Sequence, residues 1–426
     1  MDFAAPYFSR QKSFVPLIQG APEKSLQQII VIPATREKEL LSSVLSFCAC
    51  TRPTHPVEII VLINEPGQAG EEEREINRTA YGEMVQLSRE MPVSWIKLYP
   101  LFQDGIPEKI AGVGNARKLG MDQALWRFRQ IGIPEGLIVS FDADAVCDPD
   151  YLQALENQMK RMPRTRGLSI YFEHDLSRER NNELQRAAII SYETYLRTYK
   201  LALQQTGFPF SFHTVGSSFA VSASTYAMQG GMNRNKAGED FYFLQKVIPL
   251  GNFLEINDTR ILLSPRISDR VPFGTGAAMQ KLLREGQSQF LTYHLDAFHD
   301  MEILFRSAAV YFGMDREETD RRMKELPEPL LQFLLLNSFG EALTEMNRNA
   351  SGENTFLKRF YQWFNAFRVL KYLNYSHKAH YRKIPASEAG KQILDRMGIQ
   401  YINQPTDEQI LLELRRYERG GAGLAG

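Results

Sequence analysis

Short runs of apolar and β-branched residues recur through the first part of the chain. Residues 28–33 (QIIVIP) and 57–64 (VEIIVLIN) are nearly continuous runs of this kind. Such runs are typical of parallel strands that are buried on both faces of a sheet. Residues 37–48 lie between them with helical spacing, so together the three segments predict a β-α-β unit with a right-handed crossover. The same reasoning predicts further strands at 94–99, 136–142, 167–172, 219–222 and 253–263.

Helical periodicity alternates with these strands and later replaces them. Residues 115–130 predict a helix that is entered through the glycine-bearing segment AGVGN, and another helix is expected from Pro149. This alternation indicates an open α/β sheet whose ligands bind beyond the carboxyl ends of the strands. After residue 276 the strand signals stop, and helices are predicted at 285–312, 317–324, 329–348, 355–375, 386–397 and 407–419. We therefore predict an α/β fold with a mostly parallel sheet in residues 1–276, and a helical C-terminal region, residues 277–426, packed on that core.

Composition narrows the classes of protein to which the chain can belong. Its 426 residues carry 50 basic and 50 acidic side chains, a balance that argues against general affinity for nucleic acid. The three cysteines, Cys48, Cys50 and Cys147, cannot form a disulfide framework, which fits a reducing cytoplasm. The N-terminus lacks a signal-peptide pattern, and no apolar run is long enough to span a bilayer. We therefore expect a cytoplasmic protein, with at most peripheral contact at the inner face of the membrane.

An acidic segment follows one of the predicted strands. The hydrophobic run GLIVSF delivers Asp142 and Asp144 to the carboxyl end of its strand. Two neighbouring carboxylates repel each other unless they are paired, and hard cations such as Mg²⁺ or Mn²⁺ prefer carboxylate and phosphate oxygens. A divalent metal site at these two residues is therefore expected. The alternative, an acidic turn that caps the next helix, better describes Asp148 or Asp150.

The segment IVSFDADAVCDPDYL resembles the aspartate-x-aspartate segment of family 2 glycosyltransferases of the GT-A fold. Three further segments are similar to motifs of that family and occur in the same order. They are VIPATRE at 31–37, GVGNAR at 112–117, and TVGSSFAV at 214–221 followed by GED at 238–240. A single match of this kind is weak, but four in order are specific. The resemblance covers roughly residues 27–275.

The resemblance implies roles for particular residues. Asp240 matches the position that deprotonates the acceptor hydroxyl in inverting members, with Glu239 as the nearest substitute. Asp142 and Asp144 are the expected ligands of Mn²⁺ or Mg²⁺. Donor and nucleotide binding is expected at Pro33, Ala34, Arg36, Glu37, Asn64, Gly114, Arg117, Asp142 and Ala143. Gly216, Ser217, Arg266 and Arg270 are candidates for an acceptor or phosphate loop.

Simple chemical arguments support the assignment of Arg117, whereas two other residues depart from the pattern of the family. Backbone amides at a helix start attract phosphate, and Arg117 lies just inside the helix that follows Gly112 and Gly114. However, Asn64 stands where many relatives place an aspartate that reads the base, and Arg36 replaces their usual asparagine. The "QxxRW" motif of processive members is absent from the sequence, which argues against polymer synthesis across a membrane.

Two further segments have alternative interpretations. The arginine- and glycine-rich segment 264–276 (SPRISDRVPFGTG) could close over a diphosphate or an anionic acceptor, or it could be a structured surface turn. Residues 356–383 contain seven Lys or Arg, nine aromatic residues and no Asp or Glu. Such a segment can lie on an anionic membrane and reach a lipid-linked acceptor, but more often its aromatic residues belong to the core while the basic ones face water.

The sequence therefore predicts a metal-dependent, inverting glycosyltransferase. It would move a sugar from a nucleotide-diphosphate sugar to a hydroxyl of a glycan, a lipid-linked saccharide or a small molecule. A nucleotidyltransferase has a similar sheet and acidic metal site, but it usually shows a glycine-rich, basic first loop, which PATRE lacks. A non-catalytic protein that kept the fold is the other alternative, and the intact Asp142, Asp144 and Asp240 argue against it.

Overall fold

The chain forms two compact units in the computed structural model, which describes residues 2–178, 182–233, 238–266, 275–284 and 289–420. The first unit comprises Met1–Asn181 and Thr214–Lys281, and the second comprises Asn182–His213 and Leu282–Gly426. The sequence analysis expected a single border at 276/277, whereas this division also assigns residues 182–213 to the second unit. No helix among the described residues has the length and apolar character needed to cross a membrane.

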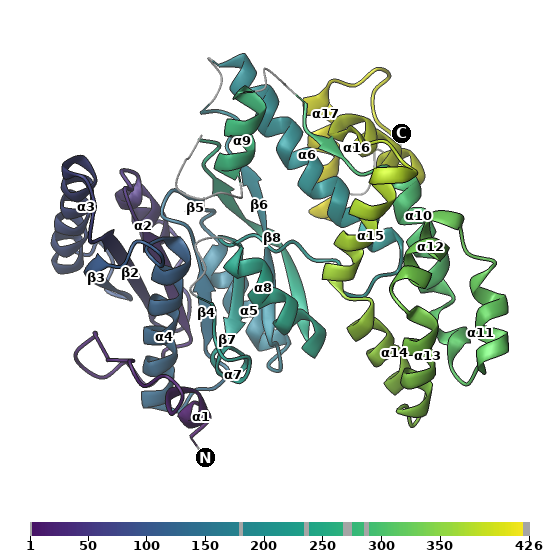
Figure 1. Cartoon of the computed structure of the whole chain (residues 1–426). Helices are drawn as coiled ribbons and strands as arrows, with labels where there is room; N and C mark the ends of the chain where they lie inside the picture. Colours follow the sequence, from purple (N-terminus) through teal and green to yellow (C-terminus); the bar gives the residue numbers. More distant parts are fainter. Residues whose placement is uncertain (1, 179–181, 234–237, 267–274, 285–288, 421–426) are drawn as a thin grey trace. The chain divides into compact units, whose positions relative to one another are not determined.

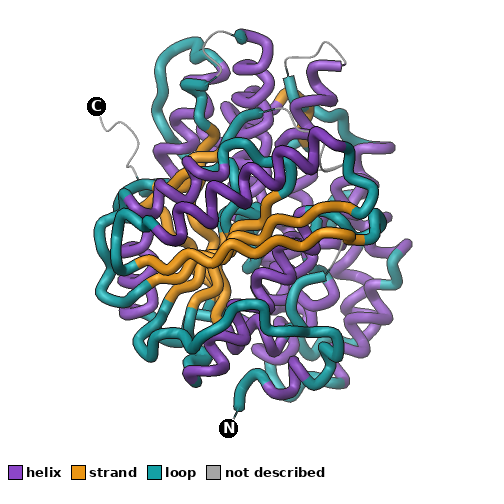
Figure 2. Tube along the Cα trace, turned by 90° about the vertical axis from the view of Figure 1, so that its left-hand side faces the viewer, coloured by secondary structure: helices purple, strands orange, loops and turns teal. Residues whose placement is uncertain are grey.

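An eight-stranded sheet forms the centre of the first unit (Figures 1 and 2). Its strands follow the order β3-β2-β1-β4-β7-β6-β8-β5. Strands β1 to β4 are mutually parallel, as are β6 and β8, whereas β7 runs antiparallel to β4 and β6, and β5 runs antiparallel to β8. The strands are β1 (Gln28–Ala34), β2 (Val57–Pro66), β3 (Ile96–Ile106), β4 (Leu137–Ser140), β5 (Val146–Cys147), β6 (Gly167–His174), β7 (Phe219–Ser222) and β8 (Phe253–Leu263).

The complete burial of several strands explains why they could be predicted from the sequence. Every residue of β1, β4, β6 and β7 is buried, as expected for strands covered on both faces. The predicted fold class, an open and mostly parallel α/β sheet flanked by helices with a helical C-terminal region, is confirmed.

Helices cover the sheet of the first unit. They are α1 (Ala5–Phe8), α2 (Leu40–Cys48), α3 (Glu71–Arg89), α4 (Val113–Ile131), α5 (Tyr151–Arg161), α7 (Ala223–Met228) and α8 (Glu239–Val247), with the 3-10 turn η1 (Ile248–Leu250). Helix α4 packs against β1 and β2. A side chain at Gly120 would place its Cβ only 2.5 Å from Val31, so glycine permits this close approach. The sequence interpretation missed α3, because this polar helix buries only Asn77, Ala80 and Met84 and gives a weak hydrophobic signal.

The second unit is almost entirely helical. Its elements are α6 (Glu183–Gln205), α10 (Leu295–Arg306), η2 (Ala308–Tyr311), α11 (Arg316–Met323), α12 (Glu328–Leu336), α13 (Phe339–Arg348), α14 (Glu353–Trp363), α15 (Ala366–Ala379), α16 (Ala386–Arg396) and α17 (Asp407–Glu418). The chain passes from the first unit to the second within helix α9 (Thr275–Arg284). The sequence did not predict the antiparallel pair of β9 (Leu291–Thr292) with β10 (Ile384–Pro385). Two residues are too few to show the alternation of apolar and polar residues by which a strand is recognised.

Three of the predicted C-terminal helices differ from the observed ones. The predicted helix 329–348 is two helices, because Ser338 adopts the left-handed conformation with φ of 52° and ends the helical path between α12 and α13. The predicted helix 355–375 is also two, because the side chain of Asn365 accepts the N–H of Arg368 and starts α15. The predicted helix 285–312 shortens to α10 and the turn η2, and residues 285–288 lie outside the described part.

The aromatic residues of segment 356–383 belong largely to the core of the second unit. Phe356, Phe360, Phe364 and Tyr372 are fully buried there. Phe305 of α10 packs edge-on against Phe364, with ring centroids 4.9 Å apart. The interpretation that placed these aromatic residues in a core is therefore confirmed.

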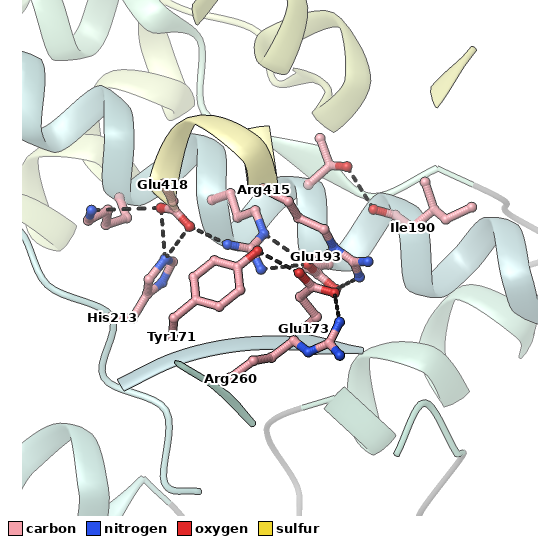
Figure 3. Close-up of polar contacts among 11 residues, drawn as sticks. Tyr171, Glu173, Ile190, Glu193, His213, Arg260, Arg415 and Glu418 are labelled. Atoms are coloured by element: carbon pink, nitrogen blue, oxygen red, sulfur yellow. Dashed lines mark hydrogen bonds and ion pairs between the residues drawn. The ribbon is translucent and has the colours of Figure 1, made fainter. Parts of the chain in front are cut away.

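A buried ionic network joins α6 to the C-terminal helix α17 (Figure 3). Glu193 accepts hydrogen bonds from Arg197 at 2.8 Å and from Arg415 at 2.6 Å. Arg197 also donates to Glu418, which lies 3.0 Å from His213. Removing one member of such a network leaves an opposite charge buried and uncompensated. The network therefore fixes α17 to α6 strongly.

The Glu418 carboxylate should make stability depend on acid pH. Burial raises its pKa, but the charges of His213 and Arg197 outweigh burial and lower the pKa to about 2. Because the folded pKa lies below the unfolded one, this stabilisation is present at neutral pH and is lost as pH falls from about 4.5 toward 2. In urea titrations, Glu418→Gln should lower the free energy of unfolding at pH 7 by roughly 3 kcal/mol and flatten its decrease below pH 4.5.

The exposed Glu341, which pairs with Arg316 at 3.3 Å, provides the control for this test. Glu341→Gln should change stability by less than about 1 kcal/mol, since exposed pairs contribute little. Equal losses in the two variants would contradict the role of the buried network.

Candidate active site

The acidic loop begins where β4 ends. The N–H of Phe141 still donates to the carbonyl oxygen of Val31, and the N–H of Ala145 then donates to the carbonyl oxygen of Asp142, which closes a tight turn. Ala145 is completely buried and holds the turn against the core, whereas the two aspartates, which alternate with alanines along the loop, remain accessible. The side chains of Asp142 and Asp144 are 36% and 22% exposed. The turn therefore presents both carboxylates at the carboxyl end of β4, where the sequence predicted them.

Arg117 is the centre of the first charge cluster. It lies in the first turns of α4 and its side chain is only 4% exposed. Its guanidinium donates to Asp142 Oδ1 at 2.7 Å and makes a close hydrogen bond to Glu239 Oε1 at the start of α8. Burial alone would lower the pKa of Arg117, but Glu239 and Asp142 raise it above the ordinary value. The arginine therefore stays charged and joins three segments, 113–117, 142 and 239, that are distant in sequence.

Asp240 lies beside this cluster and is half-buried. It occupies the first turn of α8, which Gly238 enters in the left-handed conformation with φ of 74°. Its Oδ1 accepts the N–H of Phe241 at 2.7 Å. Burial raises the pKa of Asp240 to about 6, and the negative charge of Glu239 adds to this, while Arg117 acts in the opposite direction. A carboxylate with a pKa near neutrality in such a setting has the properties of a general base.

Gly216 borders both charged groups. A Cβ atom at this position would lie 2.7 Å from Asp240 Oδ2 and 3.1 Å from Arg117 Nη2. Its carbonyl oxygen accepts the hydroxyl of Ser140 at 2.6 Å, which ties the loop before β7 to the end of β4. Ser217, in contrast, is buried, with its hydroxyl 3.3 Å from that of Ser218. The structure thus brings Gly216 to the cluster and keeps Ser217 inside the protein.

Arg266 is the centre of a second charge cluster. It follows β8 and donates two hydrogen bonds to Glu37, one of them at 2.9 Å, while Nη2 lies 2.8 Å from Asp144 Oδ2. Glu37 is buried in the turn after β1. Glu37 and Asp144 therefore share one guanidinium, a pairing that the sequence did not reveal. Arg270, the other predicted arginine of this loop, lies outside the described residues.

The opening turn after β1 is held by a residue that the sequence interpretation missed. Pro33 and Ala34 are buried at the end of β1, and Arg36 follows with φ of 49°. The backbone N–H of Arg36 donates to Asn77 Oδ1 at 2.8 Å. Asn77 was not identified because α3 itself was not predicted, yet it fixes the conformation of this turn.

Asn64 contacts the glycine-containing segment that leads into α4. It is buried at the end of β2, and its amide donates to the carbonyl oxygen of Gly112 at 2.8 Å. That hydrogen bond orients the amide, and Oδ1 has no hydrogen-bond partner within the described residues. Gly114 lies in the first turn of α4. Asn64 and Gly114 are therefore on neighbouring segments at the same edge of the sheet.

The predicted divalent metal can be tested against the available oxygen ligands. Among the described residues there is no group of three or more His, Cys, Asp or Glu side chains that could hold a metal ion. Asp142 and Asp144 each face a different arginine, but both are partly exposed. Mg²⁺ and Mn²⁺ sites that bind nucleotides commonly use one or two carboxylates together with phosphate oxygens and water. Two aspartates fit that kind of site and do not form a complete metal site by themselves.

No protein-family model matches the sequence, and no curated protein matches it. Solved structures with similar chain traces include residues 1–349 of Staphylococcus aureus TarS in complex with UDP-GlcNAc. The two sequences are 12% identical, the TM-score is 0.40, and the match covers 80% of this chain and 92% of the TarS chain. Another is the mannosyltransferase PcManGT from Pyrobaculum calidifontis in complex with GDP-Man and Mn²⁺, at 13% identity and a TM-score of 0.36 over 98% of this chain and 94% of that one.

The close approach at Gly216 leads to a testable prediction. Gly216→Ala should displace Asp240 or Arg117, because the added methyl group would lie within 3.1 Å of both, and should lower the free energy of unfolding by roughly 1–3 kcal/mol. At the helical Gly82, an added methyl group would meet no atom within 4 Å, so Gly82→Ala should be neutral or stabilising by up to about 1 kcal/mol. Thermal unfolding of both variants checks this, and a Gly216→Ala protein as stable as wild type would contradict the packing.

Proposed function

We propose that this protein is a glycosyltransferase that transfers a sugar, with inversion, from a nucleotide-diphosphate sugar to an acceptor hydroxyl. The observation that carries the proposal is the Asp240 carboxylate, whose pKa is raised to about 6, beside Gly216 and the Arg117–Asp142 pair. A general base works best when its pKa lies near the working pH. The order of the four sequence segments that resemble family 2 glycosyltransferases agrees with this assignment.

The geometry favours Asp240 over Glu239 as the base. Glu239 is buried and its carboxylate is engaged by the Arg117 guanidinium. A carboxylate that is buried in an ion pair is not accessible to an acceptor hydroxyl. Asp240 has the raised pKa and adjoins the backbone of Gly216. We therefore assign Glu239 to holding Arg117 in place and Asp240 to accepting the proton.

In the proposed reaction the acceptor hydroxyl loses its proton to Asp240 as its oxygen attacks the anomeric carbon. The bond from that carbon to the diphosphate breaks on the opposite face, and the nucleoside diphosphate leaves with the electron pair. Asp142 and Asp144 would hold a Mn²⁺ or Mg²⁺ ion, which would offset the negative charge of the leaving diphosphate. Arg117, which is fixed by two carboxylates, keeps the end of β4 and the start of α8 in register for this transfer.

Donor binding is proposed to reorganise the second cluster. Arg266 neutralises Asp144 and Glu37. A metal ion held by Asp144 would therefore replace this guanidinium as the partner of the carboxylate, and the guanidinium would become available to the diphosphate. An arginine can bind phosphate oxygens with two donors. The acceptor is proposed to be a glycan, a lipid-linked saccharide or a small molecule that carries a hydroxyl group.

The metal can be tested by ligand-induced stabilisation. UDP, GDP or dTDP, or one of their sugars, should raise Tm more with Mn²⁺ or Mg²⁺ than with EDTA, because a ligand of the native state stabilises it according to its occupancy. Asp144→Asn should abolish that metal-dependent increment. Asp148→Asn provides the control, since Asp148 lies four residues further on and pairs with Arg260 at 3.0 Å. An increment unchanged in Asp144→Asn would place the metal elsewhere.

The base can be tested by kinetics with the donor that the stabilisation screen identifies. Asp240→Asn keeps the shape and removes the basicity, so kcat should fall roughly 10²- to 10⁴-fold while donor binding persists. Wild-type kcat/KM should rise as pH increases through about 6, the pKa of Asp240, because only the ionised carboxylate accepts a proton.

Glu239→Gln distinguishes the two carboxylates. Burial and Glu239 both raise the pKa of Asp240, so loss of the Glu239 charge should move the rising limb of the pH profile to lower pH. Activity should remain measurable. Wild-type turnover in Asp240→Asn would refute the assignment, whereas an inactive Glu239→Gln with an active Asp240→Asn would exchange the two roles.

A further inference from the structure

The outer surface of α12 carries apolar residues that the core does not use. Leu330, Phe333 and Leu334 of this helix are buried, as expected for its inner face. Leu335 and Leu336, however, are 62% and 72% exposed. A helix on a water-exposed surface normally presents polar residues on that side. Two adjacent exposed leucines at the end of α12 therefore call for an explanation beyond the packing of this unit.

The neighbouring surface of α15 is basic. Lys371 and Lys378 are exposed, and because they are seven residues apart they lie on the same face of the helix. Tyr375 lies between them along this face, and its hydroxyl donates to Gln332 Oε1 on α12 at 3.2 Å. Gln332 shares the exposed face of α12 with Leu335 and Leu336, three and four residues further on. This hydrogen bond joins the leucine pair and the lysine pair into one continuous surface.

Internal packing fixes the two helices to each other. The ring of Phe333 on α12 lies 5.3 Å from that of Tyr372 and 5.6 Å from that of Tyr375, both on α15. Helices α12 and α15 are neighbours in the second unit (Figure 1). Aromatic packing thus holds together the two helices that carry Gln332, Leu335, Leu336, Lys371 and Lys378, here called the α12–α15 surface.

The basic residues of this region are not neutralised by the protein. Lys358, Arg359, Lys371, Lys378, Arg382 and Lys383 are all exposed. In the ranges that the structure describes, none of these six side chains forms an ion pair with a carboxylate. Since the whole chain has a formal net charge of zero, this local excess of positive charge is a property of the segment and not of the protein.

We propose that the α12–α15 surface docks the protein on an anionic lipid membrane. Lysines at a membrane surface are attracted by anionic headgroups, and adjacent apolar side chains enter the boundary between headgroups and acyl chains. The exposed leucines favour a lipid surface over a soluble polyanion, which would need only the charges. This docking is independent of the sugar transfer proposed above.

Co-sedimentation of the full chain with lipid vesicles tests the proposal. The wild type should bind vesicles of phosphatidylcholine with phosphatidylglycerol, but not vesicles of phosphatidylcholine alone, and about 0.5 M NaCl should weaken the binding by screening. Lys371→Glu with Lys378→Glu should reduce affinity by at least roughly 25-fold, since the loss of each basic residue removes about fivefold and the added negative charges are repelled by the anionic lipid. Leu335→Ser with Leu336→Ser should reduce it by at least about tenfold, because the apolar contact is lost.

A matched control uses Lys324→Glu with Lys391→Glu. Both lysines are exposed residues of the same unit, and the charge change is identical. This variant should bind anionic vesicles nearly as the wild type does, and all variants should keep the wild-type Tm. Wild type that sediments with neither vesicle, or a control that loses as much as Lys371→Glu with Lys378→Glu, would overturn the proposal. Unimpaired vesicle binding by the leucine variant, with tight binding to soluble polyphosphate, would instead indicate an anionic polymer and also overturn it.

Discussion

The buried guanidinium of Arg117 is the interaction on which the candidate site depends. It is almost wholly removed from water and makes hydrogen bonds to Asp142 after β4 and to Glu239 at the start of α8. A buried charge is tolerated only where opposite charges and hydrogen bonds compensate for its lost hydration. The buried Arg117 therefore needs both carboxylates, and the buried Glu239 needs the arginine. This requirement brings the start of α4, the acidic loop and the start of α8 together and sets the environment of Asp240.

The same principle gives the two aspartates of the acidic loop different environments. Asp142 is paired with Arg117, whereas Asp144 is paired with Arg266, which also holds the buried Glu37. Two carboxylates two residues apart are thereby kept from repelling each other before any ligand arrives. A metal ion would bring positive charge to the acidic loop, and a diphosphate would bring negative charge. The arginine pairing thus explains how the loop is stable in a protein whose proposed function requires it to bind charged ligands.

Buried charge also organises the second unit, by a different route. Glu193, Arg197 and Glu418 connect α6 with α17, so the last helix of the chain is held to a helix that precedes β7 in sequence. This explains why residues 182–213 belong to the helical unit, although they lie inside the segment that resembles a glycosyltransferase domain. On the α12–α15 surface, in contrast, lysines have no carboxylate partners among the described residues and leucines face outward. There the unit has charge and apolar area that its own packing does not use.

The sequence by itself determined the class of fold, the place of the acidic loop and seven of the eight strands of the main sheet, whereas the two-residue strand β5 was not predicted. Continuous apolar runs such as 28–34 and 57–63 are a local signal, because a strand buried on both faces requires them. The α3 helix and the breaks at Ser338 and Asn365 were not predicted from the sequence. A polar helix and a break of one or two residues change the spacing of apolar residues too little to be recognised. Only the tertiary structure decided the pairing of Arg117 with Glu239 and of Arg266 with Asp144. In both pairs the partners are 122 residues apart, and which charges meet depends on the packing of whole elements rather than on any local pattern.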